Sequence, residues 1–327
     1  MSKAGDGTHW VGFDLGGTKM LAAVYDREFK LVGRARTKTK GHDGKEAGLD
    51  RIVRTIHKSL DEAEVSPSAL RGIGMGCPGP LDLERGIIFD APNLGWKDVP
   101  VVDVLTDEFG CSSVIVNDVD AGVYGEYRFG AAKKAHTVVG VFPGTGIGGG
   151  CVYNGSILRG KVGSCMEIGH VQVMPEGPRC GCGRRGCLEA VASRLAIASR
   201  AAAAAYRGQA PHLLNNVGTD ISEIRSGALA ASVAAGDKAI EQIIREAARH
   251  IGRAVAGVVH LLAPDVVVLG GGMVEALPEL FVKEVGTTAQ KRVLSSYSDT
   301  FAVVAAELAD DASVLGAASW AERMATA

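Results

Sequence analysis

The chain has 327 residues, of which 46% are hydrophobic and 22% charged, a composition typical of a globular protein with a full-sized core. This length favours two compact domains. The formal net charge of −2 without a basic cluster argues against binding to nucleic-acid phosphates, and no apolar run approaches the roughly 18 residues of a membrane-spanning helix.

The first half of the chain alternates predicted strands and helices. Residues 9–26 are predicted to form a strand, a glycine turn and a second strand, and 31–39 a third strand. Apolar residues at helical spacing predict a helix over 48–65. Residues 70–80 indicate a buried strand that runs into a Gly-Pro loop, and 112–130 indicate a strand followed by a helix.

The same order of elements then starts again. Residues 136–155 predict another strand, glycine turn and strand. The Ala-rich stretch 188–206 and the amphipathic stretch 237–264 predict helices, and 265–273 predicts a buried strand that ends in a third glycine turn. This recurrence predicts two related α/β lobes, each of which opens with a phosphate-type turn.

Three glycine-rich turns are candidates for nucleotide binding. In DLGGTK, backbone N–H groups could face an anion and the Asp could hold Mg²⁺ directly or through water, although an ordinary hairpin turn is the alternative. GTGIGGG is followed by a strand rather than a helix, which argues against a dinucleotide-binding fold and favours a second phosphate loop. LGGG could lie against adenine or ribose, or could simply be a tight strand-to-helix turn. The candidate nucleotide-binding residues are Asp14, Gly16, Gly17, Thr18, Lys19, Gly144, Thr145, Gly146, Gly270, Gly271 and Gly272.

Three of the seven cysteines lie within eight residues, in the stretch RCGCGRRGCLEA (179–190). The first ten residues, MSKAGDGTHW, lack a signal-peptide pattern, so we expect a cytoplasmic protein in which disulfides are disfavoured. A redox pair is also disfavoured, because CxC without a thioredoxin-like setting is uncommon. His170, ten residues before Cys180, completes a tetrahedral donor set for a structural Zn²⁺ ion. The predicted ligands are His170, Cys180, Cys182 and Cys187.

The stretch VNDVD places acidic residues where a predicted strand ends. Asp118, which follows Asn117, is well placed to act as a general base on a substrate hydroxyl. The alternative is that Asp118 or Asp120 caps the helix that follows.

In this order and at these separations, the five elements resemble the ROK family (repressors, uncharacterised frames and sugar kinases). The resemblance runs from about Gly12 to Ala318. Its most specific parts are GTGIGGG with EIGH downstream, and the CxCGxxGCxE cluster. It implies an α/β fold of the two-lobed actin-like or ribonuclease-H-like ATPase type, in which ATP and sugar meet in an interlobe cleft. We expect a small lobe over 1–118 plus 309–327, and a larger lobe with the zinc-binding loop over 119–308.

The resemblance also implies roles for individual residues. Asp118 would be the catalytic base toward a sugar hydroxyl, and LGGG would lie at the adenosine. The cofactors would be ATP, Mg²⁺ and structural Zn²⁺, and the partner a second copy of the chain in a homodimer. The implied sugar-binding residues are Asn117, Glu167, His170 and Glu189.

This chain departs from the family pattern in two places. Cys165-Met166 stands where many members have Ala-Gly, which makes the sugar-side loop bulkier. Asp120 stands where Asn is commoner and adds a negative charge near the base. Both departures bear on the identity of the sugar, which the resemblance leaves open, and not on the chemistry.

The resemblance leaves three functions to compare for this chain: a DNA-binding repressor, a non-catalytic sugar sensor and a sugar kinase. ROK repressors carry a winged-helix domain ahead of the first glycine turn, and Asp14 lies only 13 residues from Met1, so no nucleic-acid partner is expected. A non-catalytic sugar sensor would be expected to lose the base or a phosphate loop. We therefore expect an ATP-dependent hexokinase that phosphorylates the 6-hydroxyl, with glucose as first choice. N-acetylmannosamine, N-acetylglucosamine, fructose and mannose are the alternative sugars, and a polyphosphate-dependent kinase is a further alternative.

Overall fold

The computed structural model describes residues 7–91, 94–161, 163 and 165–326. The chain divides into two compact units. The first unit comprises Met1–Lys134, Gly155–Cys165 and Asp310–Ala327, and the second comprises Ala135–Asn154 and Met166–Ala309. In the part of the chain described, none of the helices has the length and apolar character needed to cross a membrane.

The division differs from the expected boundary after residue 118. The helix α3 (Asp118–Phe129) belongs to the first unit because it packs along α11 (Asp311–Thr326), the last helix of the chain. Small residues permit this close packing: a Cβ at Gly125 or Gly316 would overlap backbone atoms of the opposite helix. A helix that shares so much surface with α11 cannot be grouped with the second sheet.

The first unit is built on a five-stranded mixed sheet with the order β3-β2-β1-β4-β8. β2 pairs antiparallel with both β1 and β3, whereas β4 and β8 join β1 in parallel. The carboxyl ends of β1, β4 and β8 therefore meet at one edge, where Asp14 pairs with Gly76 and Gly76 with Val116. The strands are β1 His9–Leu15, β2 Lys19–Tyr25, β3 Leu31–Lys38, β4 Leu70–Cys77 and β8 Ser112–Asn117.

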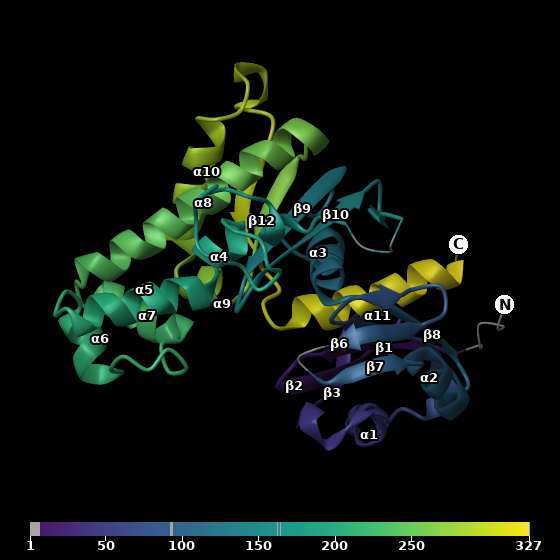
Figure 1. Ribbon diagram of the computed structural model, residues 1–327. Helices are drawn as coiled ribbons and strands as arrows, with labels where there is room; N and C mark the ends of the chain where they lie inside the picture. Colours follow the sequence, from purple (N-terminus) through teal and green to yellow (C-terminus); the bar gives the residue numbers. More distant parts are fainter. Residues whose placement is uncertain (1–6, 92–93, 162, 164, 327) are drawn as a thin grey trace. The chain divides into compact units, whose positions relative to one another are not determined.

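Helices cover both faces of this sheet (Figure 1). α1 (Lys45–Ala63) and α2 (Val101–Phe109) lie over the face to which alternate residues of β1 contribute the apolar core, including Val11, Phe13 and Leu15. α3 and α11 lie on the other face. A small antiparallel sheet is formed by β5 Leu81–Asp82, β6 Ile87–Ala91 and β7 Trp96–Val99.

The second sheet repeats the plan of the first. Its order is β11-β10-β9-β12-β13, with β9 and β10 antiparallel and with β12 parallel to both β9 and β13. The predicted recurrence of two α/β lobes is thus visible as one strand order used twice. The strands are β9 Thr137–Pro143, β10 Ile147–Tyr153, β11 Ser156–Ile157, β12 Val266–Leu269 and β13 Ala302–Ala305.

The predicted helix over 188–206 is two helices. Ser193 has extended backbone angles, and its Oγ accepts a hydrogen bond of 3.2 Å from the backbone N–H of Ala196. Ser193 therefore begins a new helix as its N-cap, a role that Ser favours over helix interiors. The helices of this unit are α4 Leu188–Ala192, α5 Arg194–Tyr206, α6 Pro211–Asn216, α7 Ser226–Ala234, α8 Lys238–Leu262, α9 Gly272–Ala276 and α10 Pro278–Gln290.

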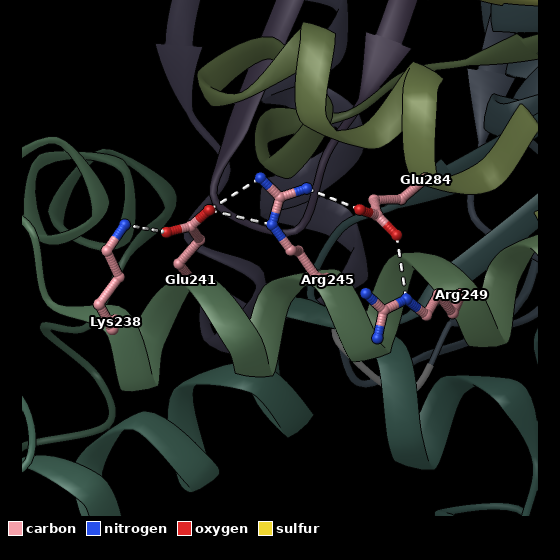
Figure 2. Close-up of polar contacts among 5 residues, drawn as sticks. All are labelled: Lys238, Glu241, Arg245, Arg249 and Glu284. Carbon is pink, nitrogen blue, oxygen red and sulfur yellow. Dashed lines mark hydrogen bonds and ion pairs between the residues drawn. The ribbon is translucent and has the colours of Figure 1, made fainter. Parts of the chain in front are cut away.

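Alternating charges connect α8 to α10 (Figure 2). Lys238 and Arg245 bind Glu241 at 2.9 and 2.8 Å along α8. Arg245 and Arg249 reach across to Glu284 on α10 at 2.6 and 3.0 Å. Because the Glu284 side chain is only 17% exposed and accepts from two arginines, it is the central member of this network.

Candidate functional site

Asn117 and Asp118 lie at the junction of β8 and α3, in the first unit. Asn117 is the N-cap of α3: its Oδ1 accepts from the backbone N–H groups of Val119 and Asp120 at 3.0 and 3.2 Å. The alternative that Asp118 or Asp120 caps this helix is therefore wrong, because the orphan N–H groups are satisfied by the preceding residue. Asp118 accepts a hydrogen bond from Val119 N to Oδ1 at 2.9 Å. Backbone N–H groups are the donors to this carboxylate, and no side chain among the described residues donates to it.

Two carboxyl groups lie at this edge of the first sheet and repel each other. Burial raises the pKa of Asp118 to about 6, and the charge of Asp14 adds to the rise. Burial also raises the pKa of Asp14, which Ser313 opposes by donating from Oγ to Oδ1 at 3.0 Å. Buried, mutually repelling carboxylates hold a proton or a hard cation more readily than exposed ones, so this donor set fits Mg²⁺.

The extra acidic residue predicted near the base interacts electrostatically with an arginine of the same unit. Asp120 is buried. Burial lowers the pKa of the Arg159 guanidinium, and the negative charge of Asp120 opposes this lowering. The negative charge is thus partly balanced within the first unit.

The first glycine turn connects β1 to β2 and is held from beneath by the end of β3. Gly16 N donates to Lys19 O at 3.0 Å, Thr39 Oγ1 donates to Gly16 O at 2.6 Å, and Thr39 N donates to Thr18 O at 2.9 Å. Gly17, Thr18 and Lys19 are exposed. A fixed backbone with an exposed Gly-Thr-Lys surface is suited to an anion.

The second glycine turn connects β9 to β10, so a strand follows it as predicted. Gly144 N donates to Gly146 O at 2.9 Å. Arg194, the first residue of α5, bonds the turn twice: its backbone N donates to Gly144 O at 2.9 Å, and its Nη2 donates to Thr145 Oγ1 at 3.0 Å. Sequence reasoning missed Arg194, because only folding brings it to a turn 49 residues earlier.

The third glycine turn connects β12 to α9 and lies beside the end of β9. A Cβ at Gly270 would overlap the ring of Phe142, and Gly271 has a φ of 82° with its Cβ direction 3.1 Å from Pro143 O. These glycines are required by the packing of a tight strand-to-helix turn, as the alternative interpretation held. The role of residues 270–272 at the adenosine stays a prediction.

The four predicted metal ligands converge in the second unit. The donor atoms of His170, Cys180, Cys182 and Cys187 all lie within 4.8 Å of one another. His170 Nδ1 is 3.7 Å from Cys180 Sγ, and Cys182 Sγ is 3.7 Å from Cys187 Sγ. Tetrahedral Zn²⁺ with bonds of about 2.3 Å to sulfur requires donors roughly 3.8 Å apart. The donor set and its spacing therefore fit one zinc ion.

A tight loop brings the cysteines together. Cys180 N donates to Arg184 O at 2.8 Å, and Gly183 N donates to Cys180 O at 2.9 Å. Cys187 then stands directly before α4, of which Glu189 is the second residue. The loop thus positions the start of α4 as well as the metal ligands.

Glu189 links the cysteine cluster to the second glycine turn. Its Oε2 accepts from Ile147 N at 3.1 Å, and its Oε1 lies 3.7 Å from Cys180 Sγ. A Cβ at Gly146 would overlap Glu189 Oε2, so this glycine admits the carboxylate to the turn. The structure therefore brings together His170, Glu189 and the second glycine turn within one unit.

Glu167 precedes the short 3₁₀ turn Ile168–His170 and its side chain is exposed. Met166 before it adopts a φ of 59°, in the left-handed region that favours glycine. The loop thus has a backbone conformation that suits the glycine of the family pattern, with a methionine in that place.

The chain is similar to known proteins over nearly its whole length. The sequence model of the ROK family matches residues 10–324. The glucokinase of Thermotoga maritima is 36% identical over 313 residues, which cover 94% of this chain and 96% of that protein. The xylose repressor of Caldicellulosiruptor bescii is 27% identical over 306 residues, which cover 94% of this chain and 76% of the repressor.

Solved structures share the fold. The crystal structure of a ROK family glucokinase from Streptomyces griseus in complex with glucose and AMPPNP matches with a TM-score of 0.82 at 30% identity, over 96% of this chain and 99% of that one. The predicted fold class is confirmed: the chain has the α/β actin-like ATPase fold of these kinases. With a family model that spans nearly its whole length and a relative above 30% identity, the chain belongs to the ROK family.

Proposed function

We propose that this protein is an ATP-dependent kinase that transfers a phosphoryl group to the 6-hydroxyl of a hexose, with glucose as the preferred sugar. The glucokinase relative at 36% identity and the related structure with glucose and AMPPNP support this proposal. The xylose repressor is less similar, at 27% identity.

The observation that carries the proposal is the raised pKa of the buried Asp118 carboxylate. Burial and repulsion from Asp14 raise its pKa to about 6, so the carboxylate is ionised at neutral pH yet readily accepts a proton. No side chain among the described residues donates to this carboxylate, so no such donor competes with a substrate hydroxyl. Phosphoryl transfer needs alignment and an acceptor for the hydroxyl proton more than covalent chemistry, and Asp118 would supply that acceptor.

The nucleotide would be held by the glycine turns. The residues at 16–19 and 144–146 would bind phosphate oxygens through backbone N–H groups, the Thr hydroxyls and Lys19, and 270–272 would lie at the adenosine. Asp14 would hold Mg²⁺, which when bound neutralises charge on the phosphates.

The sugar would be recognised by neutral and acidic acceptors. The capping role of Asn117 uses its Oδ1, which leaves the side-chain NH₂ group to donate to a sugar oxygen. If His170 binds zinc through Nδ1, the nitrogen nearest Cys180, its other ring nitrogen is left for a hydroxyl. Glu167 and Glu189 would accept from ring hydroxyls. Zinc would do no chemistry, since protein fills its four positions.

An ADP-release assay with ATP and Mg²⁺ across hexoses and N-acetylhexosamines tests the proposal. We expect the highest kcat/KM with glucose, above mannose, fructose, N-acetylglucosamine and N-acetylmannosamine. The Asp118→Asn variant should lose at least ~1,000-fold in kcat while it retains glucose affinity by calorimetry, because only proton transfer is removed.

The same panel separates the kinase from a sugar sensor. Sugar binding without turnover on any sugar would favour the non-catalytic function suggested by the similarity to a xylose repressor. Near-normal turnover by Asp118→Asn would show that another group accepts the proton. We further propose a homodimer, which light scattering of the purified protein tests.

A further inference from the structure

Arg194 reaches the second glycine turn with two separate bonds. Its backbone N–H bonds Gly144 O, and its guanidinium Nη2 donates to Thr145 Oγ1 at 3.0 Å. The first bond ties the start of α5 to the turn and does not depend on the side chain. The second bond places the charged guanidinium against the Thr145 hydroxyl and contributes nothing to the hydrogen bonding of α5.

The charge of Arg194 has no counter-ion in the part of the chain that the structure describes. Among the residues the structure describes, no carboxylate lies within ion-pair distance of its guanidinium. Arg200, farther along the same helix, differs in this respect because it pairs with Glu246 at 2.5 Å. A half-buried guanidinium that bonds a hydroxyl and lacks an acid is a site for an anion.

The contact fixes the direction of the Thr145 hydroxyl. A guanidinium can only donate, so Thr145 Oγ1 must accept from Arg194. The hydroxyl proton of Thr145 is then directed to a different acceptor. Thr145 is exposed at the tip of the turn, where that acceptor would come from a ligand.

Arg194 also supplies what the turn lacks. The first glycine turn contains Lys19, whereas residues 144–150 contain no charged side chain. A second phosphate loop without a cation would rely on backbone dipoles alone. Arg194 brings a full positive charge to that loop from α5.

We infer that Arg194 is a positioning residue for the nucleotide: it holds Thr145 as a hydrogen-bond donor toward a phosphate oxygen of ATP and adds its charge to the second glycine turn. This inference rests on the proposed kinase function, in which ATP is the phosphoryl donor. In physical terms, Arg194 and Thr145 together would bind a nucleoside triphosphate.

Kinetics and binding of single and double variants test this pair. Arg194→Gln should raise the KM for ATP roughly 10-fold, while the KM for glucose stays within about twofold, because the positive charge near the phosphates and the fixed direction of the Thr145 hydroxyl are both lost. Arg194→Lys should recover most of the affinity, since an ammonium also only donates. Arg200→Gln is the matched control on α5 and should leave both KM values unchanged, because its partner is Glu246.

A double-variant cycle shows whether Arg194 acts through Thr145. Thr145→Val keeps the side-chain shape and removes the hydroxyl. In that background, Arg194→Gln should cost clearly less than in the wild type, with the remainder due to the charge alone. If the two effects multiply fully, or if Arg194→Gln changes the glucose KM as much as the ATP KM, the inference is wrong.

Direct calorimetry with Mg·ATP separates this inference from the proposed function. Weaker binding by Arg194→Gln than by wild type supports it, even if no sugar is phosphorylated. Equal ATP binding by a variant that melts at the wild-type temperature overturns it, even in an active kinase. Failure of the wild type to bind ATP would overturn both.

Discussion

Asp118 has its chemical properties because of its surroundings rather than its residue type. It follows a buried strand and begins a helix that its neighbour Asn117 already caps. Burial and the charge of Asp14 then raise its pKa to about 6. An aspartate with an ordinary pKa would be a weaker proton acceptor, because basicity follows pKa.

This pKa predicts how activity depends on pH. Only ionised Asp118 can accept the hydroxyl proton, so kcat/KM for the sugar should be constant above about pH 6 and fall below it. The decline should approach tenfold per pH unit, as expected for one proton. Initial rates measured from pH 5 to 8 at constant ionic strength check it.

Stability provides the control for this pH profile. Because the folded-state pKa of Asp118 lies above the unfolded value, ionised Asp118 destabilises the fold, and the penalty develops from about pH 4 upward and is complete above pH 6. Asp118→Asn should therefore melt at the same or a higher temperature at pH 8. A pH profile that stays level down to pH 5 would contradict the assignment of the base.

At the scale of elements, the cysteine loop places the predicted metal ligands directly before the helix that carries Glu189. The ligands of the predicted zinc ion span His170 to Cys187, and Glu189 follows at once on α4. Closing this loop orders residues that have little regular structure of their own. Loss of the ion should release His170 and Glu189 together.

We therefore expect one Zn²⁺ per chain by elemental analysis. Cys187→Ser should lower the zinc content, the melting temperature and the affinity for sugar, because the loop and both sugar-side residues lose their fixed positions. Cys165→Ser is the control, since Cys165 lies outside the cluster, and it should retain full zinc. A zinc-free protein with unchanged sugar affinity would be inconsistent with this role.

The charge network between α8 and α10 predicts a loss of stability that depends on salt concentration. Glu284→Gln removes the negative charge that Arg245 and Arg249 share and one of its two acceptor oxygens, and it should lower stability by ~1 kcal/mol, more at low salt than at high salt. Thermal unfolding at two salt concentrations measures it. Asp50→Asn breaks the exposed pair with Arg54, whose side chains are 74% and 71% exposed, and should have almost no effect. Equal losses in both variants would mean that burial of Glu284 is unimportant.

At the scale of the whole molecule, short-range patterns were predictable and long-range partners were not. The strand–turn–strand units follow from glycine between β-branched runs, and the convergence of His170 with the three cysteines follows from their close spacing in the chain. Arg194 could not be assigned to Thr145, because no sequence pattern joins residues 49 apart. The division of the chain at α3 was likewise missed, since it depends on a helix that begins at Asp311.

That last helix packs against both the first sheet and α3. α11 lies on β1 and β4 through Gly12 and Gly74, where a Cβ would overlap the backbone of α11. On its other side, a Cβ at Gly316 would overlap Ala121 O of α3. The packing joins the two ends of the chain by direct backbone approach, which only glycine allows.

Gly316→Ala should therefore lower stability by ~2 kcal/mol or more, although alanine is the better helix former by roughly 1 kcal/mol. Gly257→Ala in α8 is the matched control: its Cβ would meet nothing within 4 Å, so the substitution should be neutral or stabilising. Thermal unfolding compares the two, and equal melting temperatures would refute the close packing of α11 on α3. Because Asp118 is the first residue of α3, Gly316→Ala should also lower kcat, whereas the zinc content, set in the other unit, should not change.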